Sequence, residues 1–143
     1  MFAKLHGRIS RPFLDRIDLA VEVPRVSLTE LSDQRRGETS GSIRKRVIRA
    51  WEIQRERYAK EGIVFNSQLE GRLIRKYCAL GPEETRLMKE VFDRLDFSAR
   101  AYDRILKVAR TIADLDGEER IGKLQLSEAI SYRSMDRRFY GGE

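Results

Sequence analysis

Residues 97–117 of the chain read FSARAYDRILKVARTIADLDG. Apolar side chains recur in this stretch every three or four residues, which predicts a long amphipathic helix. Ser98 is a favourable N-cap, Phe97 before it is placed to pack on Tyr102 as a hydrophobic staple, and Gly117 is typical of a helix end. The predicted buried face consists of Tyr102, Ile105, Leu106, Ala109, Ile112 and Ala113. The segment indicates a helical domain.

Helical periodicity recurs on both sides of this segment. It predicts a long helix over residues 42–60, a shorter one over about 68–78, a third that opens at Gly81-Pro82, and a last one over about 123–133. On the first of these, the predicted inward stripe is Ile43, Val47, Trp51, Gln54 and Tyr58. We therefore expect a small all-α bundle of five helices over residues 42–135.

A strand pattern precedes the helices. In residues 17–23, IDLAVEV, apolar and polar side chains alternate, β-branched residues are frequent, and Pro24 ends the run. No second convincing strand follows, and one strand alone cannot satisfy its backbone hydrogen bonds. We expect a mainly α chain preceded by one strand, left over from a sheet whose other strands lie outside this sequence.

Composition excludes several classes of protein. The chain has 143 residues, 41% of them apolar and 36% charged, with a formal net charge of +6. This length and apolar content predict one ordinary folded domain or a small domain with an appendage. The single cysteine, Cys78, allows no internal disulfide, no stretch resembles a signal peptide, and no apolar run is long enough to span a bilayer. The expectation is a cytoplasmic protein with no membrane partner.

The inventory of reactive residues excludes a complete nucleotide or metal site. His6 and Cys78 are single and far apart, which does not fit a zinc site or a Cys/His catalytic pair. The scattered glycines form neither a phosphate-binding loop nor a GxGxxG turn. Most acidic residues alternate with Arg or Lys at helical spacing, as on a solvated helix face.

For two arginines there is an alternative to the interpretation as solvated surface residues. Arg100 falls in the first turn of the predicted helix, where the helix dipole disfavours a cation unless an anion binds there as well. Arg104, Lys107 and Arg110 are explained by a solvated face. Arg16 stands at the entrance of the predicted strand; it either forms a salt bridge with Asp15 or Asp18, or points at a phosphate of a neighbouring subunit.

The sequence resembles a known family over nearly its whole length. GRISRPFLDRIDLAVEVP is similar to the segment that ends the core ATPase domain in the magnesium-chelatase-like branch of AAA+ ATPases. GIVFNSQLEGRLIRKYC, LDFSARAYDRILKVARTIADL and LQLSEAISYRSMDR resemble the C-terminal helical lid of its bacterial subgroup called YifB or ComM. The resemblance implies a boundary between core and lid within this chain: residues 1–24 end the core, 25–41 are a linker and 42–143 are the lid.

The same resemblance implies a role for each arginine. Members of the family form hexameric rings that hold ATP and Mg²⁺ between subunits, where Arg16 would be the arginine finger, Asp15 a supporting residue, and Arg100 the sensor 2 residue. The expected activity is ATP hydrolysis coupled to DNA recombination or competence-type remodelling. The phosphate-binding loop and the acidic residues that complete the site are missing here, so this chain alone should be inactive. Ser10-Arg11-Pro12 departs from the usual Ser-Gly-Pro, and Phe13 replaces a leucine.

Two other functions stay open at this point. A pI near 9.7 and the basic cluster Arg44, Lys45, Arg46 and Arg49 would suit a helical nucleic-acid-binding module. On that helix the aromatic residues Trp51 and Tyr58 are expected in the core rather than as platforms for bases. The family also includes the ATPase subunit of magnesium chelatase, although nothing in the sequence suggests a porphyrin site.

Overall fold

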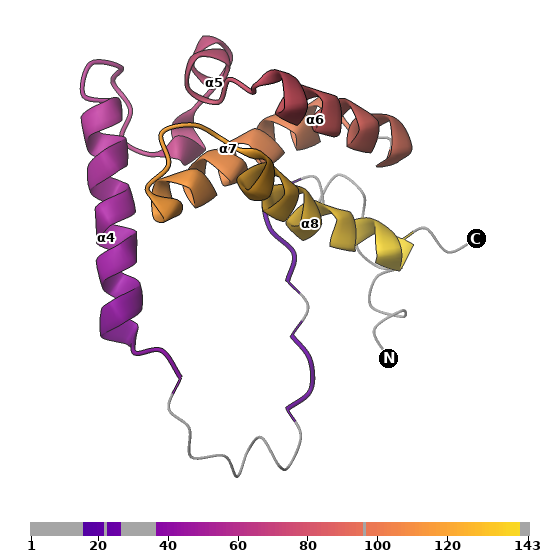
Figure 1. Ribbon diagram of the computed structural model, residues 1–143, viewed down its shortest axis with the longest axis horizontal. Coiled ribbons are helices and arrows are strands. Elements are labelled where there is room, and N and C mark those ends of the chain that lie inside the picture. Colours follow the sequence, from indigo (N-terminus) through magenta and orange to yellow (C-terminus); the bar gives the residue numbers. More distant parts are fainter. Residues whose placement is uncertain (1–15, 22, 27–36, 96, 141–143) are drawn as a thin grey trace.

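The computed structural model describes residues 16–21, 23–26, 37–95 and 97–140. In this part of the chain it contains five α-helices and one short 3₁₀ helix (Figure 1). In chain order they are α4 (Ser40–Arg57), η1 (Asn66–Gln68), α5 (Arg72–Tyr77), α6 (Pro82–Leu95), α7 (Ala99–Asp116) and α8 (Lys123–Tyr140). The predicted mainly α class with five helices is confirmed, and α8 continues seven residues beyond its predicted end near residue 133.

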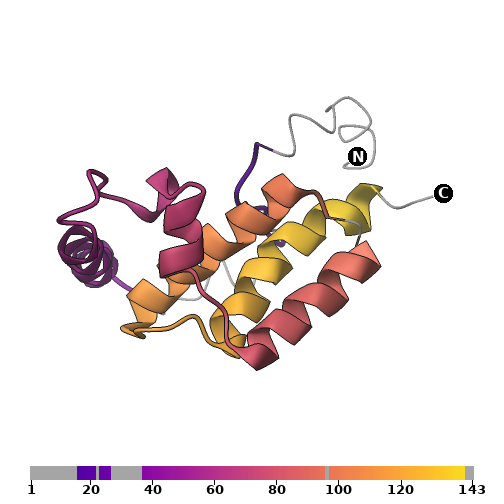
Figure 2. The same ribbon diagram turned by 90° about the horizontal axis from the view of Figure 1, so that it is seen from above.

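Helix α7 is the centre of the fold. As predicted, its N-cap is Ser98, whose hydroxyl accepts a hydrogen bond from the Ala101 N–H at 3.2 Å. Gly117 ends it in the left-handed conformation, with φ of 77°. Helix α7 packs along α8, which also contacts α6, while α4 and α5 contact α7 (Figure 2). Every other helix is therefore positioned by α7 or α8.

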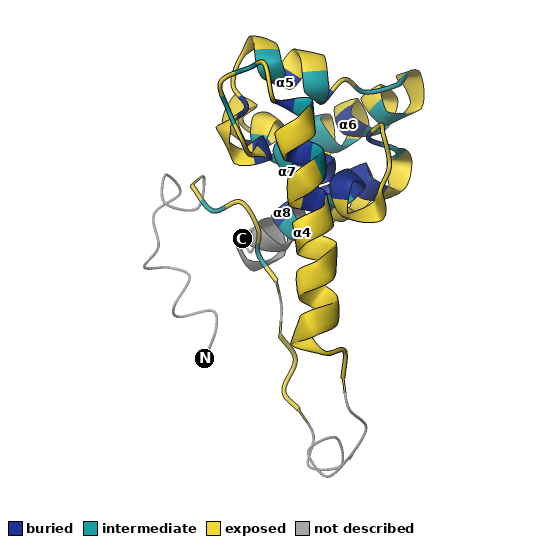
Figure 3. Ribbon diagram, turned by 90° about the vertical axis from the view of Figure 1, so that its left-hand side faces the viewer, coloured by how far each residue is buried: buried dark blue, intermediate teal, exposed yellow. Residues whose placement is uncertain are grey.

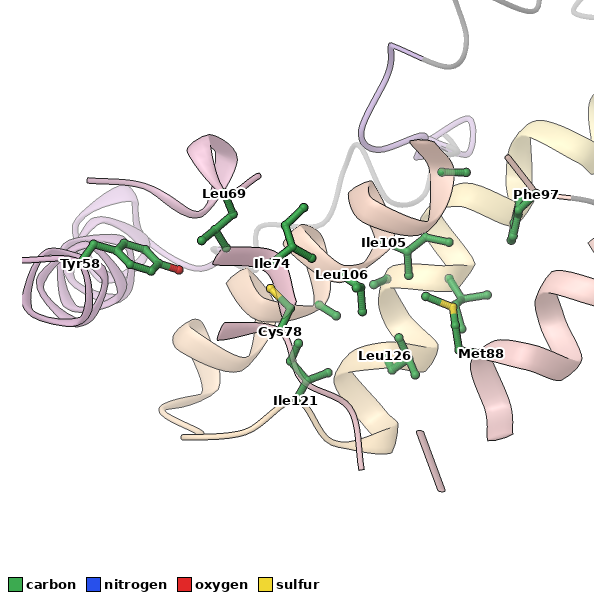
Figure 4. Close-up of a cluster of buried hydrophobic side chains, with 14 residues drawn as sticks. Tyr58, Leu69, Ile74, Cys78, Met88, Phe97, Ile105, Leu106, Ile121 and Leu126 are labelled. Carbon is green, nitrogen blue, oxygen red and sulfur yellow. The ribbon is translucent and has the colours of Figure 1, made fainter. Parts of the chain in front are cut away.

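The core lies between these helices (Figure 4). Leu126 of α8 and Ala109 of α7 are completely buried, and Met88 contributes from α6. Burying one such large apolar side chain is worth about 1.5–3 kcal/mol. The cluster extends toward α4 and α5 through Tyr58, Leu69, Ile74 and Cys78.

The strand predicted over residues 17–23 is not formed in the described residues 17–21 and 23. A strand needs a neighbouring strand to accept its backbone hydrogen bonds, and the described part of the chain provides none. Instead, the Ala20 N–H donates to the carbonyl of Tyr132 in α8 at 3.0 Å. The apolar side chains of the alternating pattern are exposed at Leu19, Val21 and Val23, by 49%, 65% and 82%.

Helix α4 is buried only at its C-terminal half. Ala50, Gln54 and Tyr58 pack inward, but the predicted stripe continues through Ile43, Val47 and Trp51, which are exposed. Figure 3 shows the N-terminal half of α4 extending past the bundle with exposed residues around it. The prediction of a fully buried stripe was wrong here because the described neighbours contact only one half of the helix.

Candidate functional site at the start of helix α7

Arg100 occupies the second position of α7 and is exposed. The first turn of this 18-residue helix contains no acidic side chain. Its free backbone N–H groups and the dipole of the helix favour an anion at this end. A guanidinium beside these N–H groups can add a bidentate contact to a phosphate. The Ser98 cap takes the Ala101 N–H, so the groups that would face an anion at this end are the Arg100 guanidinium and the N–H groups of Ala99 and Arg100.

The backbone of Arg16 is attached to the same helix, one turn further along. Arg104 donates through Nη1 to the Arg16 carbonyl at 2.9 Å and forms an ion pair with Asp18. Asp18 is thus engaged by Arg104 and not by Arg16, and Asp15 lies outside the described residues. The Arg16 side chain is exposed and makes no ion pair within the described ranges. The backbone of Arg16 thus lies beside the turn of α7 that follows Arg100. The side chains of Arg16 and Arg100 form no hydrogen bond with each other in the described residues.

Helix α8 holds the residues that follow Arg16. Arg133 donates to the carbonyl of Ile17, in addition to the bond between Ala20 and Tyr132. A largely apolar cavity of about 580 Å³ lies between this segment, α7 and α8. Its lining includes Leu19, Val21, Val108, Ile112, Leu115 and Tyr132, with Arg104 and Lys107 at its polar side.

A buried polar network occupies the other end of α7. Asp114 is 1% exposed and accepts a hydrogen bond from Arg57 of α4 at 2.9 Å and another from Asn66 of η1 at 2.8 Å. Arg110, one turn earlier on α7, bonds Asp114 and also donates to the carbonyls of Glu118 and Glu119, at 2.6 and 2.8 Å. The network ties α4, η1 and the loop after α7 together.

This network corrects one sequence prediction. Arg110 was expected on a solvated face, but it is 2% exposed. Burial lowers the pKa of its guanidinium, and Asp114 opposes that effect. For Arg57 burial also lowers the pKa, but the hydrogen bonds and charge interactions with Asp114 and Tyr58 together outweigh burial, and the net pKa is raised. The sequence feature that pointed to this network was the four-residue spacing of Arg110 and Asp114, which is typical of an ion pair within a helix.

The basic cluster lies on the exposed half of α4. Arg44, Lys45, Arg46 and Arg49 are all exposed, and Arg46 pairs with Glu38 at 2.6 Å. Tyr58 is buried as predicted, and it donates to the Asn66 amide oxygen at 2.6 Å. Trp51 was expected in the core but is 51% exposed.

Other kinds of site find little support in the described ranges. These residues contain no group of three or more His, Cys, Asp or Glu side chains able to hold a metal ion. None of the helices described is long and apolar enough to cross a membrane. Cys78 is buried, and burial raises the pKa of its thiol to about 11, which keeps it protonated and unreactive near neutral pH.

Comparison with known proteins identifies the domain. The sequence profile of the family described as magnesium chelatase, subunit ChlI C-terminal, matches residues 37–133, which is more than half of the chain. The chain belongs to this family. The matched residues include α4 to α7 and α8 as far as Arg133.

Relatives of the chain match almost all of it. It is 45% identical over 132 residues to the uncharacterized protein YifB of Salmonella typhimurium and 44% identical over 134 residues to the competence protein ComM of Haemophilus influenzae. An uncharacterized protein of Mycobacterium tuberculosis is 32% identical over 127 residues. The matches cover 92%, 92% and 89% of this chain but 25% of each relative. The chain thus spans about a quarter of the length of these proteins and corresponds to their C-terminal quarter.

Proposed function

We propose that this chain is the helical lid, with the adjoining end of the core, of a magnesium-chelatase-like AAA+ ATPase of the ComM and YifB type. In a protein of the relatives' full length, residues 1–24 would end the core, 25–41 link it to the lid, and 42–143 form the lid. The upstream three quarters would supply the phosphate-binding loop and the acidic residues that hold Mg²⁺. ATP would bind between subunits of a homo-oligomeric ring, a hexamer by the family resemblance.

Arg100 is the sensor 2 residue in this proposal. The observation that carries it is the position of Arg100 in the exposed first turn of α7, beside free backbone N–H groups and with no acidic residue in that turn. A solvated surface arginine gains nothing from this position, because the helix dipole disfavours a cation there by about 0.3–1 kcal/mol. A phosphate of ATP would reverse that cost. Arg100 would then stabilise the charge on the phosphates from the lid side.

Arg16 is the arginine finger, with Asp15 as its supporting residue. The exposed side chain of Arg16 and the absence of an ion pair for it in the described segments are consistent with a residue that acts on a neighbouring subunit. Arg104 fixes the Arg16 backbone to α7. Because Arg100 is on the same helix, a movement of α7 on nucleotide binding would also move the finger. Arg104 is thus a positioning residue in this proposal.

The work driven by hydrolysis is DNA recombination or remodelling of the competence type. The similarity to the competence protein ComM over 92% of the chain favours this function over magnesium insertion into a porphyrin. The alternative function is that of the magnesium chelatase ATPase subunit, which the description of the family names. Chelatase activity on protoporphyrin, measured with the full-length protein, separates the two.

The test uses a protein of the relatives' full length that carries this chain. Arg100→Ala should leave ring assembly intact, as measured by analytical ultracentrifugation, and strongly reduce ATP turnover. Arg86→Ala, an exposed arginine of α6, is the matched control and should turn over ATP like the wild type. Unchanged turnover in the Arg100→Ala ring would overturn the sensor 2 assignment.

A further inference from the structure

Two aromatic rings are exposed next to each other where α4 meets η1. Trp51 of α4 is 51% exposed and Phe65, which precedes η1, is 39% exposed. Their ring centroids are 5.8 Å apart with an interplanar angle of 58°. Tyr58, which caps the C-terminal end of α4, is 1% exposed in the core. The exposed rings of Trp51 and Phe65 thus form an aromatic surface that is separate from the core of the domain.

A shallow cleft of about 350 Å³ opens at these rings. Its other lining residues are polar: Gln54, Asn66, Ser67 and Thr111. The backbone N–H of Asn66 donates to the Gln54 amide oxygen at 2.9 Å, and the Asn66 side-chain amide donates to Thr111 and Asp114. The Ser67 hydroxyl makes no hydrogen bond to any residue the structure describes. Aromatic walls with a polar floor suit a flat heteroaromatic ring that carries hydrogen-bonding groups at its edge.

Positive charge lies on the same side of α4 as Trp51. Arg44 is seven residues before Trp51 and Arg55 four residues after it, spacings that place all three side chains on one helix face. Both arginines are exposed and neither forms an ion pair with a described residue. The acidic residues of this helix, Glu52 and Glu56, are rotated from Trp51 by about 100° and about 140°. The face of α4 around Trp51 is therefore positively charged, and no acidic residue of this helix lies on that face to neutralise the charge.

We propose that this face of α4 binds single-stranded nucleic acid. An unpaired base stacks on Trp51 in the cleft beside Phe65, and Arg44 and Arg55 contact phosphates on either side of it. The two arginines are about 16 Å apart along the helix axis, so the site covers a short stretch of strand. Stacking on aromatic side chains combined with backbone contacts is the usual chemistry of sequence-tolerant single-strand binding. The inference rests on residues of α4 and η1 and is independent of the roles proposed for Arg16 and Arg100.

Trp51 is the only tryptophan of the chain, so its fluorescence reports on the proposed site directly. The 143-residue chain is titrated at low salt with a thymidine oligomer, a uridine oligomer of equal length, and a DNA duplex. The proposal expects saturable quenching by at least one of the single strands and an affinity that falls steeply with salt. The duplex should quench little, because its bases are already stacked. Absence of binding at low salt, or equal quenching by the duplex, would overturn it.

Variants assign the binding to the named residues. Affinity for a fluorescently labelled oligomer is measured by anisotropy, which does not require Trp51. Trp51→Ala should bind about 5- to 150-fold more weakly, while Trp51→Phe retains part of the affinity. Arg44→Glu should weaken binding more than Lys45→Glu, the matched charge reversal on the same helix about 120° from Trp51. If Trp51→Ala binds like the wild type, or the two reversals have equal effects, the proposal fails.

Discussion

Asp114 and Arg110 illustrate how two charged residues on one helix come to lie in the interior. Both are nearly inaccessible, and Asp114 bonds Arg57, Asn66 and Arg110 at the same time. Removing the charge from one member of a buried ion pair leaves its partner uncompensated, which is more costly than losing an exposed pair. The network therefore matters for stability more than any pair on the surface.

We predict that Asp114→Asn lowers the free energy of unfolding by about 3–5 kcal/mol, because Arg110 would stay buried without its counterion. Urea denaturation followed by circular dichroism measures the change. Asp103→Asn, at an exposed position of the same helix, is the control and should change stability by less than about 0.5 kcal/mol. Equal stability of the two variants would show that the network contributes no more than a surface residue.

Cys78 gives a prediction that depends on pH. Burial raises the pKa of its thiol from 9.0 to about 11. A pKa that is higher in the folded state stabilises the fold below pH 9, and this contribution is lost as the pH rises through about 11. At pH 8 the native protein should react with a thiol reagent much more slowly than the protein in urea. Native labelling as fast as in urea would mean that Cys78 is not buried.

At the level of single residues, the sequence was informative about caps and less so about charges. Ser98 and Gly117 were correctly predicted to bound α7, because both act through local backbone hydrogen bonds. Arg100 and Arg110 lie on the same helix, yet one is exposed and the other buried. The spacing of Arg110 and Asp114 indicated an ion pair, but the burial of that pair depends on Arg57 and on the loop after α7, which are long-range contacts.

Helix α4 shows the same limit for a whole element. The spacing of its apolar residues correctly predicted a helix, but such spacing does not indicate how much of the helix is covered by a neighbouring element. Ile43, Val47 and Trp51 continue the apolar face of Tyr58, yet α7 reaches only the C-terminal half of α4. The strand over residues 17–23 failed for a related reason, since alternation indicates a strand only where a partner strand is present.

The two halves of α4 should therefore differ in local stability. Backbone amides before about Arg49 are predicted to exchange with deuterium much faster than those of α7, because the side chains of this half are exposed and little packing opposes its fraying. Hydrogen exchange measured by mass spectrometry resolves the two regions. Protection over residues 42–49 equal to that of α7 would indicate that another part of the chain covers this half.

At the scale of the molecule, the described residues form a bundle that carries two arginines at one end of α7. The class and helix count followed from periodicity, and the resemblance to the magnesium-chelatase-like family led to the family that the profile match establishes. The roles proposed for Arg16 and Arg100 depend on groups beyond these residues. The chain spans about 25% of the relatives' length, and in the proposal the rest of such a protein completes the nucleotide site.

Subunit mixing tests the proposed shared site most directly. In a protein of full length, Arg16→Ala and Arg100→Ala rings should each assemble, and losing the finger should reduce ATP turnover by roughly 10³–10⁵-fold. Mixing the two variants should restore part of the turnover, because some interfaces then pair an intact Arg16 with an intact Arg100 from the adjacent subunit. Wild-type turnover by the Arg16→Ala ring alone would contradict the account.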